Sequence, residues 1–543
     1  MANKLPTSVY SIIVVEFLER YSYYAMRAIL TMYFSESLHL SDSTSVSFFL
    51  YTSALAYFTP CVGGYLSDSR WGKFATISRF GSIYVVGFLV LSFSALQSKM
   101  SGTMIGLVLI GIGTGGIKPC VSSFGADQLP DPNDEKKLRK YFSTFYFAIN
   151  VGALLSYIVS PLVRQVAGYG AAFFLPAVFM TLALVVFIRG KPTYIINLPR
   201  NDRKERDAKN ADSSTSTTST ISTPPSSFPM LGNVVWTALC TPRVSPEHDG
   251  KSFLQLAGPS CSETQIKATV DFFRTFKFVM IMPFFWMLYD QQGSVWILQA
   301  KRLDMGSFLQ PENMGAFNTL LVLVLLPLFE KFLYPALERI HVEVTALRRM
   351  SCGMVLASVA FFMSAILERA ISKSFDNSIS VFWQLPQYAV LTVAEIGVST
   401  TGLEFFYAEA PPAYKTATGE SEEDENTENA SHFLKLTLHT IHNTISFHSA
   451  SLFLLTTAFG DMFGGVLYSL ANVFGETAET ILFVCAMFML VASFFFIREA
   501  KVYIYRKGEI EGESEPESGI ELAESKHLIP TRREGFDMSS VAA

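Results

Sequence analysis

The chain consists largely of apolar stretches of membrane-spanning length, separated by polar segments that are mostly short. A helix needs about 20 mostly apolar residues to cross the hydrocarbon core of a bilayer. Roughly twelve stretches meet this criterion, so the pattern predicts an all-α membrane protein. The predicted spans lie at residues 8–34, 45–66, 75–97, 102–124, 141–163, 169–189, 269–290, 313–336, 347–367, 381–407, 449–471 and 478–498.

The longest polar interval, residues 191–268, divides the predicted spans into two groups of six. Its middle, Ser213 to Ser227, is almost wholly Ser, Thr and Pro, a composition that cannot bury a core and is typical of a flexible cytosolic linker. Two six-helix bundles joined in this way are the organisation of the major facilitator superfamily. The predicted parts are a first bundle at 1–190, the linker at 191–268, a second bundle at 269–499 and a disordered acidic cytosolic tail at 500–543.

A polar segment at residues 416–448 precedes the predicted eleventh span. It opens with an acidic run and continues with four histidines, which favours a solvated loop insertion over a metal site. A retained intron in the gene model is a second explanation, and it would distort the start of that span. The histidines are His432, His439, His442 and His448.

Basic residues gather at alternate turns between the predicted spans. Since Lys and Arg concentrate in cytoplasmic loops, both termini are predicted to face the cytoplasm. The basic turns carry Arg70, Lys73 and Arg79, then Lys136, Lys137, Arg139 and Lys140, then Arg189, Lys191 and Arg200, then Arg339, Arg348 and Arg349, and finally Arg498, Lys501, Arg506 and Lys507.

Composition strengthens the membrane interpretation and argues against an enzyme. Half of the 543 residues are apolar and 16% are charged, whereas soluble proteins carry about 25% charged residues. The six cysteines form no C-x-x-C pair, so neither a metal site nor a disulfide framework is expected. The sequence has no nucleophile–base constellation, and we expect no catalytic residues and no cofactor.

The first predicted span holds the densest group of charges, and ionisable residues inside a membrane are functional candidates by default. Glu16 and Arg20 are four residues apart, so they share a helix face and can pair. Glu19 and Arg27 share another face, and a guanidinium in a bundle cavity suits a bidentate carboxylate. The alternative is that these charges only neutralise one another and hold helices together.

Later spans add isolated ionisable groups. Lys118 is a single ammonium in a glycine-rich span, where it is either a proton-linked switch or a side chain that reaches the interface. The glycines favour close helix packing over a phosphate loop. Asp290, Glu395 and Glu404 are carboxylates in apolar helices, and each can hold and release a proton.

Three further charges lie toward the cytoplasmic ends of the predicted spans. Arg274 and Glu330 either form a gating salt bridge or only mark the interface. Asp68 lies in a turn with small residues and a base, where a salt bridge can latch one conformation, although positive-inside topology alone also accounts for the turn.

Several motifs at these positions resemble those of the proton-dependent oligopeptide transporter family, a branch of the major facilitator superfamily. Glu16-Phe-Leu-Glu-Arg-Tyr-Ser-Tyr-Tyr24 resembles the family's E-x-x-E-R-F-x-Y-Y signature, and the segment Gly111 to Gln128 resembles its fourth-helix signature. The resemblance covers nearly all the predicted spans. The fifth, seventh and tenth spans contribute Phe145 to Asn150, Trp286 to Gln299 and Gly402 to Tyr407.

The resemblance implies a central cavity with walls of opposite charge. Arg27 and Lys118 would hold the C-terminal carboxylate of a peptide, and Glu404 its amino terminus. Backbone-directed contacts would leave side-chain specificity loose. Proton coupling would involve Glu16, Glu19, Arg20, Lys118 and Asp290, and gating would involve Arg274, Glu330 and Asp68. The cavity would be lined by Tyr24, Tyr57, Tyr146, Asn150, Trp286 and Asn318.

Two departures from the family pattern matter. Animal-type members carry a histidine in the second span where this chain has Leu50, so coupling would rest on the carboxylates and Lys118. The large extracellular domain before the tenth span is also absent, because only a short loop joins Arg369 to Val381.

The sequence therefore predicts symport of protons with dipeptides and tripeptides by alternating access, driven by a proton gradient. A carrier of nitrate, histidine or another small solute is the first alternative, although Glu404 would repel an anion. A peptide sensor or receptor with little flux is the second. We expect a monomer in the plasma membrane or in an endosomal, lysosomal or vacuolar membrane, with lipid as its surroundings and no nucleic acid partner.

Overall fold

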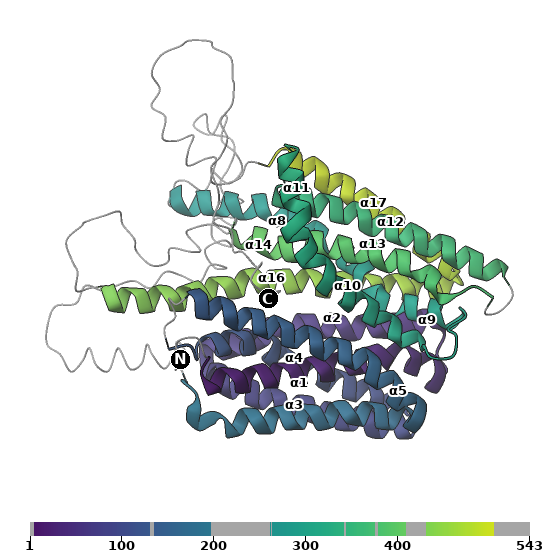
Figure 1. Ribbon diagram of the computed structural model, residues 1–543, viewed down its shortest axis with the longest axis horizontal. Coiled ribbons are helices and arrows are strands. Elements are labelled where there is room, and N and C mark those ends of the chain that lie inside the picture. Colours follow the sequence, from purple (N-terminus) through teal and green to yellow (C-terminus); the bar gives the residue numbers. More distant parts are fainter. Residues whose placement is uncertain are drawn as a thin grey trace, which may run out of the picture.

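The computed structural model describes residues 5–130, 135–196, 261, 263–341, 344–374, 378–408 and 431–503, and almost all of them are helical. Two groups of long helices lie beside each other (Figure 1). Helices α1 to α5, purple to blue, form the first group, and helices α8 to α17, teal to yellow, form the second.

The first group follows the predicted spans closely. Ser41 begins α2 as an N-cap, since its hydroxyl accepts from the backbone N–H of Thr44 at 3.3 Å. Gly168, at φ +80°, divides α5 into two crossings, a conformation that glycine adopts without steric cost. The elements are α1 (Thr7–Met32), η1 (Tyr33–Ser37), α2 (Asp42–Leu66), η2 (Ser67–Trp71), α3 (Gly72–Leu96), α4 (Met100–Ala126), α5 (Glu135–Arg189) and η3 (Lys191–Thr193).

The second group contains shorter helices and several breaks. They are α8 (Glu263–Tyr289), η6 (Asp290–Gly293), α9 (Val295–Lys301), η7 (Pro311–Asn313), α10 (Met314–Leu328), η8 (Phe329–Leu333), α11 (Tyr334–Arg339), α12 (Ala346–Lys373), η9 (Val381–Gln384), α13 (Leu385–Glu395), η10 (Ile396–Thr400), α14 (Thr401–Ala408), α16 (Ser431–Phe474) and α17 (Ala478–Lys501).

Each predicted span falls on a helix or on consecutive helical segments. By length and composition, seven helical stretches among the described residues can cross a membrane, and two of these are 55 and 50 residues long, enough for two crossings each. Helix α16 begins at Ser431 rather than near residue 449, so residues 431–448 of the predicted insertion are helical. The linker centre, residues 409–430, the acidic tail beyond 503 and the histidine side chains of α16 lie outside the described residues.

Glycines let α3 and α4 approach closely. A Cβ atom on Gly113 of α4 would lie 2.7 Å from the Cα atom of Tyr84, and one on Gly87 of α3 would lie 2.8 Å from the backbone nitrogen of Ile110. The glycine-rich segment before Lys118 therefore serves helix packing, as the sequence predicted.

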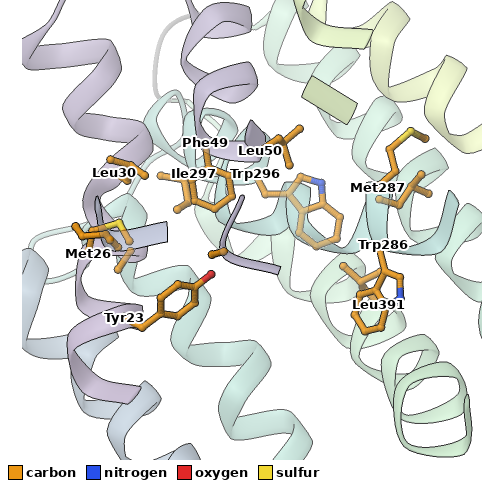
Figure 2. Packing of buried hydrophobic residues seen from close by; sticks show 14 of the residues in the cluster. Tyr23, Met26, Leu30, Phe49, Leu50, Trp286, Met287, Trp296, Ile297 and Leu391 are labelled. Carbon is orange, nitrogen blue, oxygen red and sulfur yellow. The ribbon is translucent and has the colours of Figure 1, made fainter. Parts of the chain in front are cut away.

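The two groups of helices share one apolar core. Its buried residues come from both groups, and Figure 2 shows Tyr23, Met26, Leu30, Phe49 and Leu50 of the first together with Trp286, Met287, Trp296, Ile297 and Leu391 of the second. Helix α16 packs on α2, and α10 packs on α5. Polar contacts reinforce the first of these interfaces, because the Tyr51 hydroxyl lies 3.1 Å from that of Ser469.

Candidate functional site

A three-residue charge cluster lies inside α1. The Nε atom of Arg20 lies 2.8 Å from a carboxylate oxygen of Glu16 and 2.7 Å from one of Glu19. Glu16 and Glu19 are 3% and 0% exposed, so one guanidinium pairs with two buried carboxyl groups. The predicted Glu16–Arg20 pair is confirmed. Removing the guanidinium would leave buried carboxyl groups without a partner, which is costly in a protein interior.

A second ion pair joins the two groups of helices. Nη2 of Arg27, on α1, lies 2.7 Å from Oδ1 of Asp290, which follows α8. The guanidinium also donates to the Tyr23 hydroxyl at 3.4 Å and lies 4.9 Å from the centroid of the Phe49 ring. One turn further along α1, the Thr31 hydroxyl donates to the carbonyl of Gly293 at 3.0 Å. No carboxylate lies three or four residues from Arg27 in α1, so its partner was not predictable from spacing. In the folded protein Asp290 of the other group provides the carboxylate.

Lys118 lies between two aromatic rings. Its Nζ atom is 4.1 Å from the ring centroids of both Tyr23 and Tyr57. The ammonium is buried and has no hydrogen-bond partner among the described residues. Cation–π contacts of this kind stabilise a desolvated ammonium without neutralising it. Lys118 and Arg27 share Tyr23 as a neighbour, so the two predicted cations lie around one tyrosine.

A further cluster, in the second group of helices, centres on a carboxylate of α13. Glu395 accepts from the Tyr289 hydroxyl at 2.7 Å and from Nδ2 of Asn318 at 3.2 Å. Asn318 is oriented in turn by Thr392, whose hydroxyl donates to its Oδ1 at 2.6 Å. Asn318 was predicted as a lining residue, and it lies on α10 beside this carboxylate. The group has hydrogen-bond donors around it, yet no cation within ion-pair distance among the described residues.

Other aromatic and amide side chains that were predicted to line the cavity come from α1, α5 and α8. The Tyr24 ring is 5.5 Å from the Tyr23 ring and 6.2 Å from the Tyr157 ring, and Tyr24 interacts electrostatically with both Arg27 and Glu395. Trp286 packs edge-on to Tyr289 at 5.5 Å. Tyr146 and Asn150, two further predicted lining residues, lie one turn apart on α5. Nδ2 of Asn150 donates to the backbone carbonyl of Tyr146 at 2.9 Å.

A network that the sequence did not predict connects the two groups at the end of the helices where α9 and η7 lie. Arg164 of α5 binds Glu36 at 3.4 Å in its own group, and Glu312 at 2.8 Å and Gln310 at 3.1 Å across the interface. Lys301 also reaches Glu36, at 3.4 Å. Gln310 and Glu312 are 146 and 148 residues away from Arg164 in the chain, so local spacing carried no signal for these contacts.

The predicted gating residues and one predicted anchor remain predictions. Arg274 lies in α8, with its guanidinium carbon 6.0 Å from the centroid of the Tyr503 ring. Glu330 lies in η8, and Asp68 lies in η2 at the end of α2. Glu404 lies in α14, and its side chain is outside the described part of the chain. No group of three or more His, Cys, Asp or Glu side chains among the described residues is arranged to hold a metal ion.

Two groups of long helices, with ionisable side chains buried inside them, are consistent with a membrane transporter fold of the major facilitator superfamily. Solved structures agree with this class. The chain superposes on the crystal structure of an auto-inhibited peptide transporter of the POT family with a TM-score of 0.71 and 27% sequence identity, covering 92% of this chain and 98% of that one. A proton-dependent oligopeptide (POT) family transporter gives a TM-score of 0.63 at 27% identity, covering 90% and 100% of the two chains.

The chain belongs to the POT family, whose model matches residues 74–447. It is similar to solute carrier family 15 member 2 of Danio rerio, with 37% identity over 385 residues, which is 68% of this chain and 50% of the relative. It is also similar to solute carrier family 15 member 1 of Homo sapiens, with 35% identity over 401 residues, 68% of this chain and 53% of the relative. The chain thus spans about half the length of these curated relatives. These proteins are carriers rather than enzymes, and the chain is an integral membrane protein.

Proposed function

We propose that the protein carries dipeptides and tripeptides across a membrane together with protons, by alternating access of one central site. The observation that carries this proposal is that two cations lie around one tyrosine, while a buried carboxylate elsewhere has no cation within ion-pair distance among the described residues. We propose that these groups, Arg27 and Lys118 on one side and Glu395 on the other, form two oppositely charged walls of one cavity. A zwitterionic peptide has one charge for each wall, whereas an inorganic anion has a partner on only one of them.

In this proposal Arg27 and Lys118 bind the peptide carboxylate. A planar guanidinium suits bidentate binding of a carboxylate. The N–H groups of the Lys118 ammonium can donate hydrogen bonds to a ligand, because its contacts among the described residues are with ring faces. Tyr24, Tyr57, Tyr146, Asn150, Trp286 and Asn318 would line the path of the peptide between the walls.

Two carboxylates are candidates for binding the peptide amino group. Glu404 is the residue that the family resemblance favours. Glu395 has the stronger support from the described contacts, since it is held by Tyr289 and by Asn318, itself a predicted lining residue. We propose Glu395 as the anchor, and the test below includes Glu404.

Proton coupling would use the buried ion pairs. Glu16, Glu19 and Arg20 form one cluster, and Arg27 with Asp290 forms another that spans the interface. A peptide carboxylate that binds Arg27 competes with Asp290, so substrate binding and protonation of Asp290 would favour each other.

We further propose that both termini face the cytoplasm, that the protein acts as a monomer without a cofactor, and that it lies in the plasma membrane or in an endosomal, lysosomal or vacuolar membrane. Arg274, Glu330 and Asp68 would gate the cytoplasmic side.

Uptake of a labelled dipeptide into proteoliposomes with an alkaline interior tests this function. We expect accumulation that a proton ionophore abolishes and that excess unlabelled dipeptide competes away. Uptake of nitrate or free histidine without dipeptide uptake would replace the proposal with a small-solute carrier, and saturable peptide binding without flux would replace it with a sensor.

A further inference from the structure

One buried carboxyl group takes no part in the site described so far. Asp461 lies on α16, and its side chain is 0% exposed. Glycines on either side bring its helix close to its neighbours, since a Cβ atom on Gly460 would lie 2.8 Å from the backbone nitrogen of Met287, and one on Gly464 would lie 2.9 Å from Cδ1 of Leu50. Asp461 is therefore enclosed between α16, α8 and α2.

The surroundings of Asp461 do not suit an ionised carboxylate. Neither of its oxygens has a hydrogen-bond donor among the described residues, and no cation there lies within ion-pair distance of it. Its hydrogen-bonding neighbour is another acid, Asp290. Asp290 uses Oδ1 for Arg27, while its Oδ2 is buried and likewise lacks a donor.

Other charged groups act on Asp461 only from further away. Arg27 of α1 and Lys118 of α4 interact with it electrostatically, but Arg27 contacts Asp290 directly and Lys118 contacts the rings of Tyr23 and Tyr57. Two neighbouring carboxyl groups, of which only Asp290 is paired with a guanidinium, cannot both be ionised at low cost in a buried site. A proton shared between the acids satisfies both orphaned sides at once.

We propose that Asp461 holds a proton in this conformation and donates it in a hydrogen bond to Oδ2 of Asp290, so that Arg27, Asp290 and Asp461 form one proton-binding site. When Arg27 leaves Asp290, the acid pair loses its counter-ion and takes up a second proton from water on the open side. When Arg27 returns, the pair releases that proton to water. The use of this exchange in transport rests on the proposed function, whereas the protonation of Asp461 does not.

The test is infrared spectroscopy of the full-length protein in lipid, which detects the carbonyl stretch of a protonated carboxyl group directly. We expect such a band in the wild type at neutral pH, and we expect it to disappear on strong alkalinisation. The band should be lost in Asp461→Asn, whose amide can donate to Asp290 in place of the acid. Asp461→Ser serves as a second variant if the first does not fold.

A matched control is Glu368→Gln. Glu368 is also buried, at 2% exposed, but it accepts from Nε2 of Gln299 at 3.0 Å and pairs with Arg302 at 2.6 Å, so its carboxyl group has the partners that Asp461 lacks and its replacement should leave the band unchanged. Persistence of the full band in both Asp461 variants, or its absence from the wild type, would overturn the proposal whether or not the protein carries peptide. Loss of the band in a protein that does not transport peptide would support the proton site and reject the proposed function.

Discussion

In the proposed function, Arg27 takes part in peptide binding, in proton coupling and in the contact between the two groups of helices. It contacts Asp290 across the interface, shares Tyr23 with Lys118 and belongs to the wall proposed to bind a peptide carboxylate. Its pair is nearly fully buried, with side chains 9% and 4% exposed. Breaking such a pair by removing one partner leaves an uncompensated buried charge, so each partner depends on the other more than the net strength of the pair suggests.

A double-mutant cycle measures that dependence. We expect Arg27→Ala and Asp290→Ala each to lower thermal stability in detergent, and the double variant to lose less than the sum, with a coupling of about 1–3 kcal/mol. Additive losses would show that the pair makes no energetic contribution. The pair of Arg369 and Glu479, at 3.8 Å and largely exposed, provides a control with an expected coupling below about 1 kcal/mol.

The aromatic setting of Lys118 gives a second prediction at the residue scale. Tyr57→Phe keeps the ring that faces the ammonium, whereas Tyr57→Leu removes it. We expect the phenylalanine variant to bind dipeptide like the wild type and the leucine variant to be less stable by about 1–2 kcal/mol, the range of a desolvated cation–π contact. Equal behaviour of the two variants, measured by thermal unfolding and peptide binding, would assign Tyr57 a role through its hydroxyl or none.

At the scale of elements, close helix packing determines where the functional side chains lie. Gly113 and Gly115 are on the same helix as Lys118, and both face neighbouring helices at distances that exclude a Cβ atom. The position of Lys118 between Tyr23 and Tyr57 therefore depends on small residues one turn away. Protein interiors resist added volume, because the surrounding atoms have little room to move.

Two alanine substitutions separate backbone contact from side-chain contact. Gly113→Ala would place a methyl group 2.7 Å from the Cα atom of Tyr84, and we expect a loss of about 1–3 kcal/mol in thermal stability. Gly81→Ala would meet the end of the Leu184 side chain at 3.1 Å, which can shift, so its effect should be within about 1 kcal/mol. A larger loss for Gly81→Ala than for Gly113→Ala would contradict this account of packing.

The elements themselves were largely predictable, because each apolar stretch has the length of one crossing. The break in α5 was expected between residues 163 and 169, and Gly168 provides it. The start of α16 was predicted wrongly, because polar and charged residues before residue 449 masked a helical continuation from Ser431. Hydropathy alone does not recognise a helix that continues past its apolar part.

At the scale of the whole molecule, contacts between the two groups of helices describe a conformation closed at one end. The contacts of Arg164 with Glu312, of Lys301 with Glu36 and of Ser41 with Asn472 join the groups at the end where α9 and η7 lie. In the proposed orientation this end faces away from the cytoplasm. Alternating access requires these contacts to break when the protein opens on that side.

Removal of Arg164 should shift the conformational balance toward opening. Spin labels at the exposed positions Gln97 and Glu476, one in each group, would report the separation of the two groups at this end. We expect Arg164→Gln to increase the population of long distances severalfold, since it removes three contacts across or beside the interface. Arg369→Gln removes an exposed ion pair with Glu479 within the second group, and it should leave the distance distribution unchanged. The same change in both variants would contradict a gating role for Arg164.

Long-range partners were what the sequence could not provide. The sequence did indicate candidate functional residues, because charged side chains are rare inside membrane spans. These candidates include Glu16, Arg20, Arg27, Lys118, Asp290 and Glu395. The pairing of Arg27 with Asp290 across the two groups, and the buried positions of Asp461 and Glu312, depend on helices that meet only in the folded protein. Asp461 carried a visible signal, a lone acid in an apolar stretch, which sequence analysis did not use.

The central claim is that opposite walls of one site bind the two charged ends of a peptide. The most direct measurement compares proteoliposome uptake of a free dipeptide, an N-acetylated dipeptide and a C-amidated dipeptide by the wild type, Arg27→Ala, Glu395→Gln and Glu404→Gln. The account predicts that the wild type strongly prefers the free dipeptide, that Glu395→Gln loses its preference for a free amino group, and that Arg27→Ala loses its preference for a free carboxylate. Equal uptake of all three compounds by the wild type would contradict the claim, and loss of amino-group preference in Glu404→Gln alone would assign that anchor to Glu404.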